Sequence, residues 1–247
     1  IGDIGNTEVK ICAFNSNKKL LKKIILKSNL ITNKYLYKRL IFLKSKKYKL
    51  RHAIFCSVVP KCYKKIKFFI KKKLNINCTE LKELKLDKLI KIKVNRKQIG
   101  SDRLSNAISV IDNKNNYVIV DFGTATTFDV IIKNNYLGGI IAPGVNLSLN
   151  TLISKASLIP SLALTSVNKV LGKNTKSAVK SGFYWGYAGL IDNVIKKIIN
   201  QTNNKYKIIF TGGLSNLFKK TIVAKVKIDR ELTIKGLLKV IHLLKQK

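Results

Sequence analysis

Hydrophobic and polar positions along the first half of the chain follow the two periods of regular secondary structure. Short apolar runs of strand length are separated by stretches in which apolar residues recur every three or four positions. One apolar run ends at Pro60, a residue that interrupts a central strand. We expect these elements: strands over 7–14, 52–59 and 89–94, an amphipathic helix over 61–74, and one strand and one helix within the lysine-rich stretch 15–50.

A helix that opens after Gly100 has the clearest periodicity. Its apolar residues fall at i, i+3, i+4 and i+7, the spacing of one buried helix face: Leu104, Ala107, Ile108 and Ile111. Ser101 or Asp102 is the expected N-cap, because either side chain can accept a hydrogen bond from a free N–H group of the first turn.

The second half repeats the alternation of strands and helices. The expected elements are strands over 117–121, 126–132, 136–141, 206–210 and 225–228, helices near 145–155, 175–200 and 233–245, and a short helix after Gly213. Alternation of this kind indicates an α/β chain. A polar run at 112–116 marks a boundary near residue 113, which divides the chain into predicted domains 1–113 and 114–247.

Charge is the most unusual property of the composition. The 247 residues include 49 Lys and Arg but only 12 Asp and Glu, a formal net charge of +37. Such a charge suggests a surface that binds polyanions, but only five of the basic residues are arginine, which base readout and bidentate phosphate recognition favour. Lysine, isoleucine and asparagine share A- and T-rich codons, so compositional drift explains the charge more simply and disfavours specific nucleic-acid binding.

The composition also restricts the class of protein and its compartment. Apolar residues make up 46% of the chain, but no run reaches the roughly 18 to 20 apolar residues of a membrane span. The four cysteines form no C-x-x-C pair and the two histidines lie far apart, which disfavours zinc. With no visible secretory signal, we expect free thiols and a cytoplasmic location. Because Ile1 stands where a first strand already runs, we also expect that a few N-terminal residues are missing.

Two glycine-containing turns share one pattern. The sequences DIGNT at 3–7 and DFGTAT at 121–126 each place an aspartate at the end of an apolar strand, followed by a glycine, a threonine and a second strand. The glycine lets backbone N–H groups approach a phosphate, and the aspartate can hold a cation or an ordered water beside it. Two such turns predict two related halves that face each other across a nucleotide-binding cleft. Ordinary hairpin turns are the alternative.

Three further segments are candidates for ligand contact. GSDR at 100–103 places a carboxylate and a guanidinium at a helix N-terminus, where the carboxylate can accept a proton from a substrate hydroxyl and the guanidinium can hold an anionic group. An N-cap aspartate beside a surface arginine is the alternative. TGG at 211–213 and GGIIAPG at 138–144 would let the backbone approach a flat ligand or a partner, although such glycines are also common caps. No P-loop or dinucleotide-binding fingerprint is present.

The ordered set of motifs resembles type III pantothenate kinases, a family of the acetate and sugar kinase/Hsp70/actin superfamily. The motifs span nearly the whole chain: D-x-G-N-T, S-V-V-P, G-x-D-R, D-x-G-T-A-x-T, G-G-x-I-x-P-G, Thr175 before Ser181-Gly182, T-G-G, and LTIKGL at 232–237. The resemblance implies two related actin-like (ribonuclease H-like) halves with a cleft between them. It also implies ATP-dependent phosphorylation of pantothenate to 4′-phosphopantothenate, the first step of coenzyme A biosynthesis, by a cytoplasmic homodimer.

The resemblance further implies roles for individual residues. Asp102 would be the general base, Asp121 would bind a monovalent cation, K⁺ or NH₄⁺, and Asp3 would hold Mg²⁺ directly or through water. The residues implied to bind ATP are Asp3, Ile4, Gly5, Asn6, Thr7, Glu8, Val9, Lys10 and Thr124. Those implied to bind pantothenate are Gly100, Ser101, Asp102, Arg103 and Thr175.

Two positions depart from the pattern of the family. Lys93 stands where the family often has an aromatic residue that contacts pantothenate, and Arg96 stands where proline is common, so we give Lys93 no substrate role. Two alternatives stay open: a non-enzymatic nucleic-acid-binding or regulatory protein on the same fold, and a superfamily kinase for another hydroxyl compound. Retention of motif aspartates in so acid-poor a chain, namely Asp3, Asp102, Asp121 and Asp129, disfavours the first.

Overall fold

The chain folds into two compact units in a computed structural model that describes residues 1–45, 48, 50–241 and 243. The first unit comprises residues 1–111 together with 231–247, and the second comprises 112–230. The boundary predicted near residue 113 lies close to the division between Ile111 and Asp112. The last segment differs from expectation, because 231–247 was assigned to the second half and groups with the first unit.

The sheet of the first unit has the strand order β3-β2-β1-β4-β5. Its strands are β1 (Gly2–Ile4), β2 (Glu8–Phe14), β3 (Leu20–Lys27), β4 (Ala53–Ser57) and β5 (Cys78–Glu80). β1 pairs antiparallel with β2, which pairs antiparallel with β3, while β4 lies parallel to both β1 and β5. The first turn motif therefore joins two central strands.

The second unit repeats this topology in the order β9-β8-β7-β10-β11. Its strands are β7 (Asn116–Phe122), β8 (Ala125–Ile132), β9 (Asn135–Pro143), β10 (Lys207–Gly212) and β11 (Val226–Ile228). β7, β8 and β9 form an antiparallel meander, and β10 lies parallel to β7 and β11. Each of these five strands thus has a counterpart in the five-stranded sheet of the first unit, which confirms the prediction of two related α/β halves.

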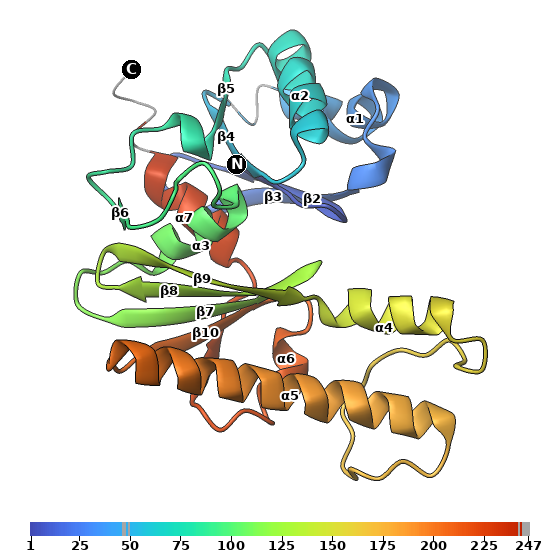
Figure 1. The fold of residues 1–247 in the computed structure, drawn as a ribbon. Coiled ribbons are helices and arrows are strands. Elements are labelled where there is room, and N and C mark those ends of the chain that lie inside the picture. The colour runs from blue at the N-terminus through green and yellow to red at the C-terminus, as the bar shows by residue number, and fades with distance from the viewer. Residues whose placement is uncertain (46–47, 49, 242, 244–247) are drawn as a thin grey trace. The chain divides into compact units, whose positions relative to one another are not determined.

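Helices cover both faces of the first sheet (Figure 1). α1 (Asn33–Leu40) and α2 (Pro60–Phe69) pack on one face, and α3 (Ser101–Val110) and α7 (Leu232–Val240) pack on the other. In the second unit the long helix α5 (Thr175–Thr202) runs along the sheet, accompanied by α4 (Val145–Lys155) and α6 (Ser215–Phe218). Among the described residues, no helix is long and apolar enough to span a membrane.

Several predicted elements differ in detail from those observed. The helix expected over 61–74 ends as α2 at Phe69 and continues as one π-helical turn, Ile70–Leu74, which stops at Asn75 in the left-handed conformation (φ 56°). Of the strand expected over 89–94, two residues form β6 (Lys91–Ile92). The helix expected to reach 245 ends at Val240, and 242 and 244–247 lie outside the described residues.

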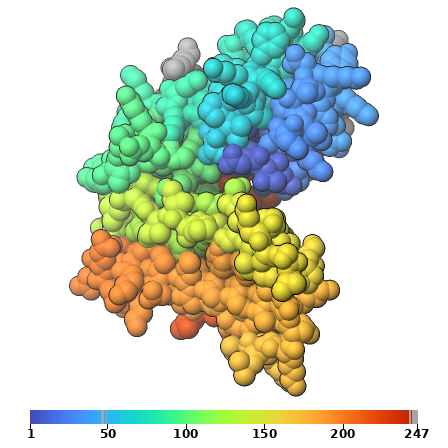
Figure 2. All heavy atoms as spheres, turned by 45° about the vertical axis from the view of Figure 1, so that its right-hand side comes forward, coloured from blue at the N-terminus to red at the C-terminus, as the bar shows by residue number. Residues whose placement is uncertain are grey.

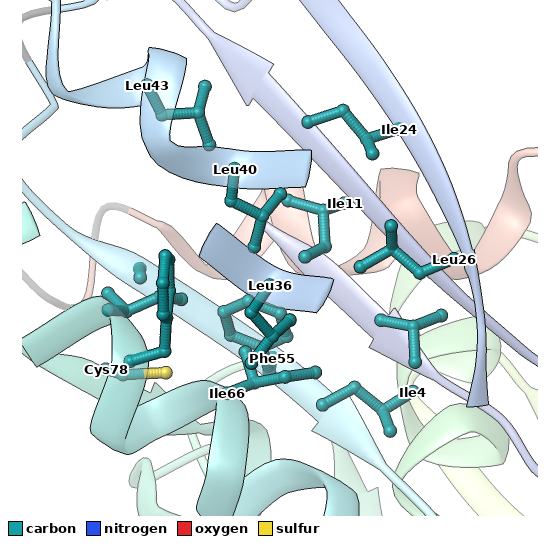
Figure 3. Packing of buried hydrophobic residues seen from close by; sticks show 14 of the residues in the cluster. Ile4, Ile11, Ile24, Leu26, Leu36, Leu40, Leu43, Phe55, Ile66 and Cys78 are labelled. Carbon is teal, nitrogen blue, oxygen red and sulfur yellow. The ribbon is translucent and has the colours of Figure 1, made fainter. Parts of the chain in front are cut away.

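Apolar side chains from the sheet and from α1 and α2 form the core of the first unit (Figure 3). Ile4 and Leu36 are wholly buried there, and Phe55 from β4 and Ile66 from α2 pack beside them. Burial of each such side chain contributes roughly 1.5–3 kcal/mol. Because Ile4 and Val9 flank the first turn and are both anchored in this core, the ends of the turn are held firmly.

The core of the second unit is built around α5 and a group of phenylalanines. Phe122 stacks on Phe218 at 5.4 Å between ring centroids and meets Phe210 edge-on at 5.1 Å. α5 contributes buried side chains at helical spacing: Tyr184, Ala188, Ile191, Ile195 and Ile198. Phe122 directly follows Asp121, so this packing fixes the end of β7 at which the second turn begins.

Close packing of α7 against α3 explains why the end of the chain belongs to the first unit. A Cβ atom on Gly236 would collide with the backbone carbonyl of Ser105, so only glycine allows the helices to approach this closely. The Ser105 hydroxyl donates to the carbonyl oxygen of Thr233 (2.7 Å), and the Thr233 hydroxyl donates to Asn106 Oδ1 (2.8 Å). The LTIKGL motif therefore serves the packing of α3, the helix that carries Asp102.

Candidate active site

The first aspartate turn is a tight hairpin between β1 and β2. The Gly5 N–H group donates to the Glu8 carbonyl at 3.0 Å, which closes the turn. Ser28 braces it from the side, because its hydroxyl donates to the Gly5 carbonyl (2.7 Å) and its N–H to the Thr7 carbonyl (3.0 Å). The turn is therefore preorganised, as a phosphate-binding loop must be.

The residues of this turn differ in what they offer to a ligand. Asn6, Thr7 and Glu8 are exposed. Ile4 and Val9 are fully buried in the core, so they could contact a nucleotide through backbone atoms only. The sequence motif placed all of them in one group and could not make this distinction.

Lys10 is paired at the base of the first turn. Its ammonium group lies 3.8 Å from Glu231, which also holds Lys23 at 2.6 Å. The pairing orients the Lys10 side chain while leaving it partly exposed (23%).

Asp3 sits at the end of β1 in largely buried surroundings. Burial raises its pKa from 3.8 to about 6, and the nearby negative charge of Asp102 adds to this effect. The Cys56 thiol opposes it by donating to Asp3 Oδ1 at 3.4 Å. The same burial, together with the charges of Asp3, Asp102 and Glu80, raises the pKa of Cys56 well above its usual value, so the thiol stays protonated as a donor. All four cysteines of the chain are buried and free.

Asp102 lies in the first turn of α3, where the structure corrects the predicted cap. The N-cap is Gly100, without a side-chain cap bond, and neither Ser101 nor Asp102 fills that position. Burial raises the pKa of Asp102, and the Arg103 N–H group, which donates to Asp102 Oδ1 at 2.7 Å, partly offsets this. A Cβ atom on Gly100 would collide with Asp102 Oδ1, so the glycine leaves room for the carboxylate.

Ser101 and Glu80 form a contact that sequence reasoning missed. Ser101 is 2% exposed, and its hydroxyl donates a hydrogen bond to Glu80 Oε1. The hydroxyl is therefore engaged within the protein, which leaves the backbone of Ser101 for any substrate contact. No local signal singled out Glu80, because Glu83 and Asp87 follow it within seven residues and Ser101 lies on a distant segment.

The second aspartate turn joins β7 to β8. The Gly123 N–H group donates to the Ala125 carbonyl at 3.1 Å, as the equivalent glycine does in the first turn. Thr124 is exposed at its tip. Gly144, the N-cap of α4, packs so closely that a Cβ atom there would collide with the Thr124 carbonyl. The turn is thus braced by a neighbouring glycine segment.

Gly212 brings the end of β10 against Asp121. It has φ +84°, and a Cβ atom there would lie 2.7 Å from Asp121 Oδ1. The TGG motif thus shapes the surroundings of Asp121, and Gly213 N–H donates to the Phe122 carbonyl at 3.2 Å.

The remaining sequence candidates have simple local surroundings. Thr175 is exposed at the start of α5, after an Asn174 capping box with Ser177. Asp129 is buried in β8 and accepts a 2.6 Å hydrogen bond from Tyr136, so it supports the sheet.

The two positions that depart from the family pattern differ in their surroundings. Arg96 donates to the carbonyls of Lys82 (3.1 Å) and Leu84 (2.6 Å), which gives it a structural role. Lys93 is exposed.

Comparisons with known proteins show the family to which the chain belongs. A family model described as type III pantothenate kinase matches residues 1–197. The chain is 56% identical to a type III pantothenate kinase of Pelagibacter ubique over 99% of both chains. It is 36% identical to one of Paramagnetospirillum magneticum, over 76% of this chain and 74% of the relative.

Solved structures with the same fold have far less similar sequences. A Campylobacter jejuni protein described as a putative Baf family transcriptional activator superposes with TM-score 0.64 at 20% identity, covering 100% of this chain and 98% of its own. A putative 2-dehydro-3-deoxygalactonokinase from Sinorhizobium meliloti gives 0.63 at 8% identity, covering 98% of each chain. At these identities the likeness concerns the fold.

Proposed function

The chain belongs to the type III pantothenate kinase family and phosphorylates pantothenate with ATP in coenzyme A biosynthesis, and we propose that Asp102 is the general base of this reaction. The observation that carries the proposal is the position of the Asp102 carboxylate, partly buried in the first turn of α3 beside Arg103. Its raised pKa moves its basicity towards neutral pH, where a proton acceptor works best.

Asp102 would act by orienting the pantothenate hydroxyl and collecting its proton. The hydroxyl oxygen bonds to the γ-phosphorus of ATP, the bond from that phosphorus to the β–γ bridging oxygen breaks, and ADP leaves. Such transfers depend mainly on positioning and charge neutralisation, so the proton moves late. The backbone of Gly100 and Ser101, the Arg103 guanidinium and the Thr175 hydroxyl would hold the anionic substrate.

The two glycine turns are the proposed nucleotide contacts. The segment from Asp3 to Lys10, Glu8 included, would contact ATP, and the side chains of Asn6 and Thr7, backbone N–H groups and the Lys10 ammonium would hold its phosphates. Thr124 would contact ATP from the second turn. The bracing by Ser28 and Gly144 supports this, because a loop fixed beforehand loses little entropy on binding.

A cation is proposed beside each of two carboxylates, Asp3 and Asp121. Asp3 and Asp102 lie within electrostatic reach of each other, and both have raised pKa values, so a cation beside Asp3 would relieve a local excess of negative charge. Asp3 would hold Mg²⁺ there, directly or through water; bound Mg²⁺ neutralises phosphate charge. Asp121, beside the backbone of Gly212, offers a single carboxylate and suits a monovalent ion, K⁺ or NH₄⁺.

A homodimer is the proposed assembly, in the cytoplasm. It is supported by apolar side chains exposed on β9 and α4: Ile140 (38%), Ile141 (64%), Leu147 (51%) and Leu152 (37%). α4 lies at the surface in Figure 2, in yellow. Ultracentrifugation should give twice the chain mass of 27.8 kDa, and a mass of 27.8 kDa at micromolar concentration would refute the dimer.

The proposed location in the cytoplasm is supported by the cysteines, because all four are free and buried, as expected in a reducing compartment.

The substrate assignment is tested by a coupled assay of ADP release. With ATP, Mg²⁺ and K⁺, ADP release should depend on pantothenate, and omission of K⁺ should lower the rate. Release that depends on another hydroxyl compound in a substrate panel would instead favour a superfamily kinase of different specificity. No release with any compound, together with salt-sensitive binding of DNA or RNA, would favour a nucleic-acid-binding protein.

A further inference from the structure

Glu80 joins three segments of the first unit through one carboxylate. It stands at the end of β5, and its Oε1 accepts from the N–H group of Ser57 at the end of β4 (3.3 Å) and from the Ser101 hydroxyl. Its Oε2 accepts from the N–H group of Lys82 at 2.6 Å. The reaction described above does not use this residue.

The contact to Ser101 takes the place of a conventional cap at the start of α3. Gly100 provides no side chain at the N-cap, so no cap bond fixes the first turn of the helix. Ser101 is the first helical residue and is held by Glu80 instead, directly before Asp102. A displacement of Ser101 would therefore move the adjoining Asp102.

The chemistry of the contact requires a carboxylate. All three partners are donors, and the two carboxylate oxygens accept them together. Glutamine has a single acceptor oxygen, so its NH₂ group would face the N–H group of Lys82 or the donors of Ser57 and Ser101. Substitution by glutamine therefore preserves size but loses part of this junction.

We propose that Glu80 is a positioning residue, which holds the first turn of α3 through Ser101 and thereby fixes the direction of the Asp102 carboxylate. This inference rests on the proposed role of Asp102 as general base. Catalytic groups displaced by about 1 Å can lose roughly 100-fold in rate, so the position of Ser101 has a measurable consequence.

The test compares Glu80→Gln, Ser101→Ala and the double variant with the wild-type enzyme. We expect each single variant to lower kcat roughly 10- to 100-fold. The KM for ATP should change little, and both single variants should stay folded at the temperature of the assay. The double variant should be no slower than the slower single variant, because both single changes remove the same contact, the hydrogen bond from Ser101 to Glu80. Glu83→Gln is the control: its carboxylate is 50% exposed, pairs with Lys67 at 3.6 Å, and should leave kcat unchanged.

Three outcomes would overturn the inference. These are a Glu80→Gln variant with wild-type kcat, losses of kcat in both single variants that parallel a loss of folded protein, or losses that multiply in the double variant. An inactive wild-type enzyme would instead overturn the proposed function itself, so the two failures are distinguishable. If Glu80→Gln does not fold, Ser101→Ala alone decides, because it leaves the Ser57 and Lys82 contacts in place.

Discussion

Asp3 and Asp102 keep carboxylates in surroundings that disfavour their charge. Burial is the main cause of the raised pKa at both residues, and the two charges repel each other. Ionisation of either carboxylate therefore lowers the stability of the folded protein without ligands. Their presence at the end of β1 and the start of α3 is explained by the cation and the proton that they would bind.

Asp3→Asn should stabilise the free protein while removing its proposed Mg²⁺ ligand. A carboxyl whose pKa rises from 3.8 unfolded to about 6 folded favours the folded state below pH 3.8 and loses this contribution as pH rises to 6. The loss is about 3 kcal/mol, so the variant should gain up to that much over wild type between pH 4 and pH 7.

Urea unfolding without nucleotide or Mg²⁺, at pH 4 and pH 7, measures the effect of Asp3→Asn. The control is Asp87→Asn, at an exposed position. Its free energy of unfolding should equal that of wild type at pH 4 and at pH 7. A stability difference between Asp3→Asn and wild type that is the same at both pH values would contradict the account.

Single residues could be predicted from the sequence where one local motif carries them. Asp3 and Asp102 each stand beside a glycine that the structure needs for close approach, Gly2 and Gly100, whereas Asp121 is approached closely by Gly212 from a distant segment. Glu80 and Cys56 could not be predicted, because their partners lie on segments distant in sequence. Ser101 was predicted as a ligand, although its hydroxyl is already bound by Glu80.

At the scale of elements, the repeated topology explains why the two turns have the same construction. In each unit the turn joins the central strand to its antiparallel neighbour, and a glycine N–H group closes it. The strand pattern predicted most of these elements because apolar alternation is a local signal. The placement of α7 could not be predicted, since it depends on how Gly236 and Thr233 meet α3.

Gly236→Ala tests the packing that holds α3. The added methyl group would collide with the Ser105 backbone, which cannot move aside as a side chain could, so we expect a loss of roughly 1–3 kcal/mol. Gly189→Ala in α5 is the matched control, because a Cβ atom there meets nothing within 4 Å and should stabilise the helix slightly. Urea unfolding measures both, and equal effects would contradict this packing.

For the whole molecule, the net charge of +37 suggests a protein that binds polyanions, whereas the ordered motifs indicate a kinase. Glu83 and Glu231 form ion pairs with three lysines of this surface, Lys67, Lys10 and Lys23. The 56% identical kinase that matches 99% of the chain supports catalysis and provides no separate role for the charge. The class of fold and the reaction could therefore be predicted from the ordered motifs, whereas net charge alone pointed to a different class of protein.

The most direct test of the account is the formation of 4′-phosphopantothenate by wild type, Asp102→Asn and Asp87→Asn, measured by mass spectrometry with ATP, Mg²⁺ and K⁺. Wild type and Asp87→Asn should form the product at equal rates. Asp102→Asn should be slower by roughly 100- to 10,000-fold, with ATP binding retained, because the proton acceptor is lost. Wild-type turnover by Asp102→Asn, or no product from the wild-type enzyme, would contradict the account.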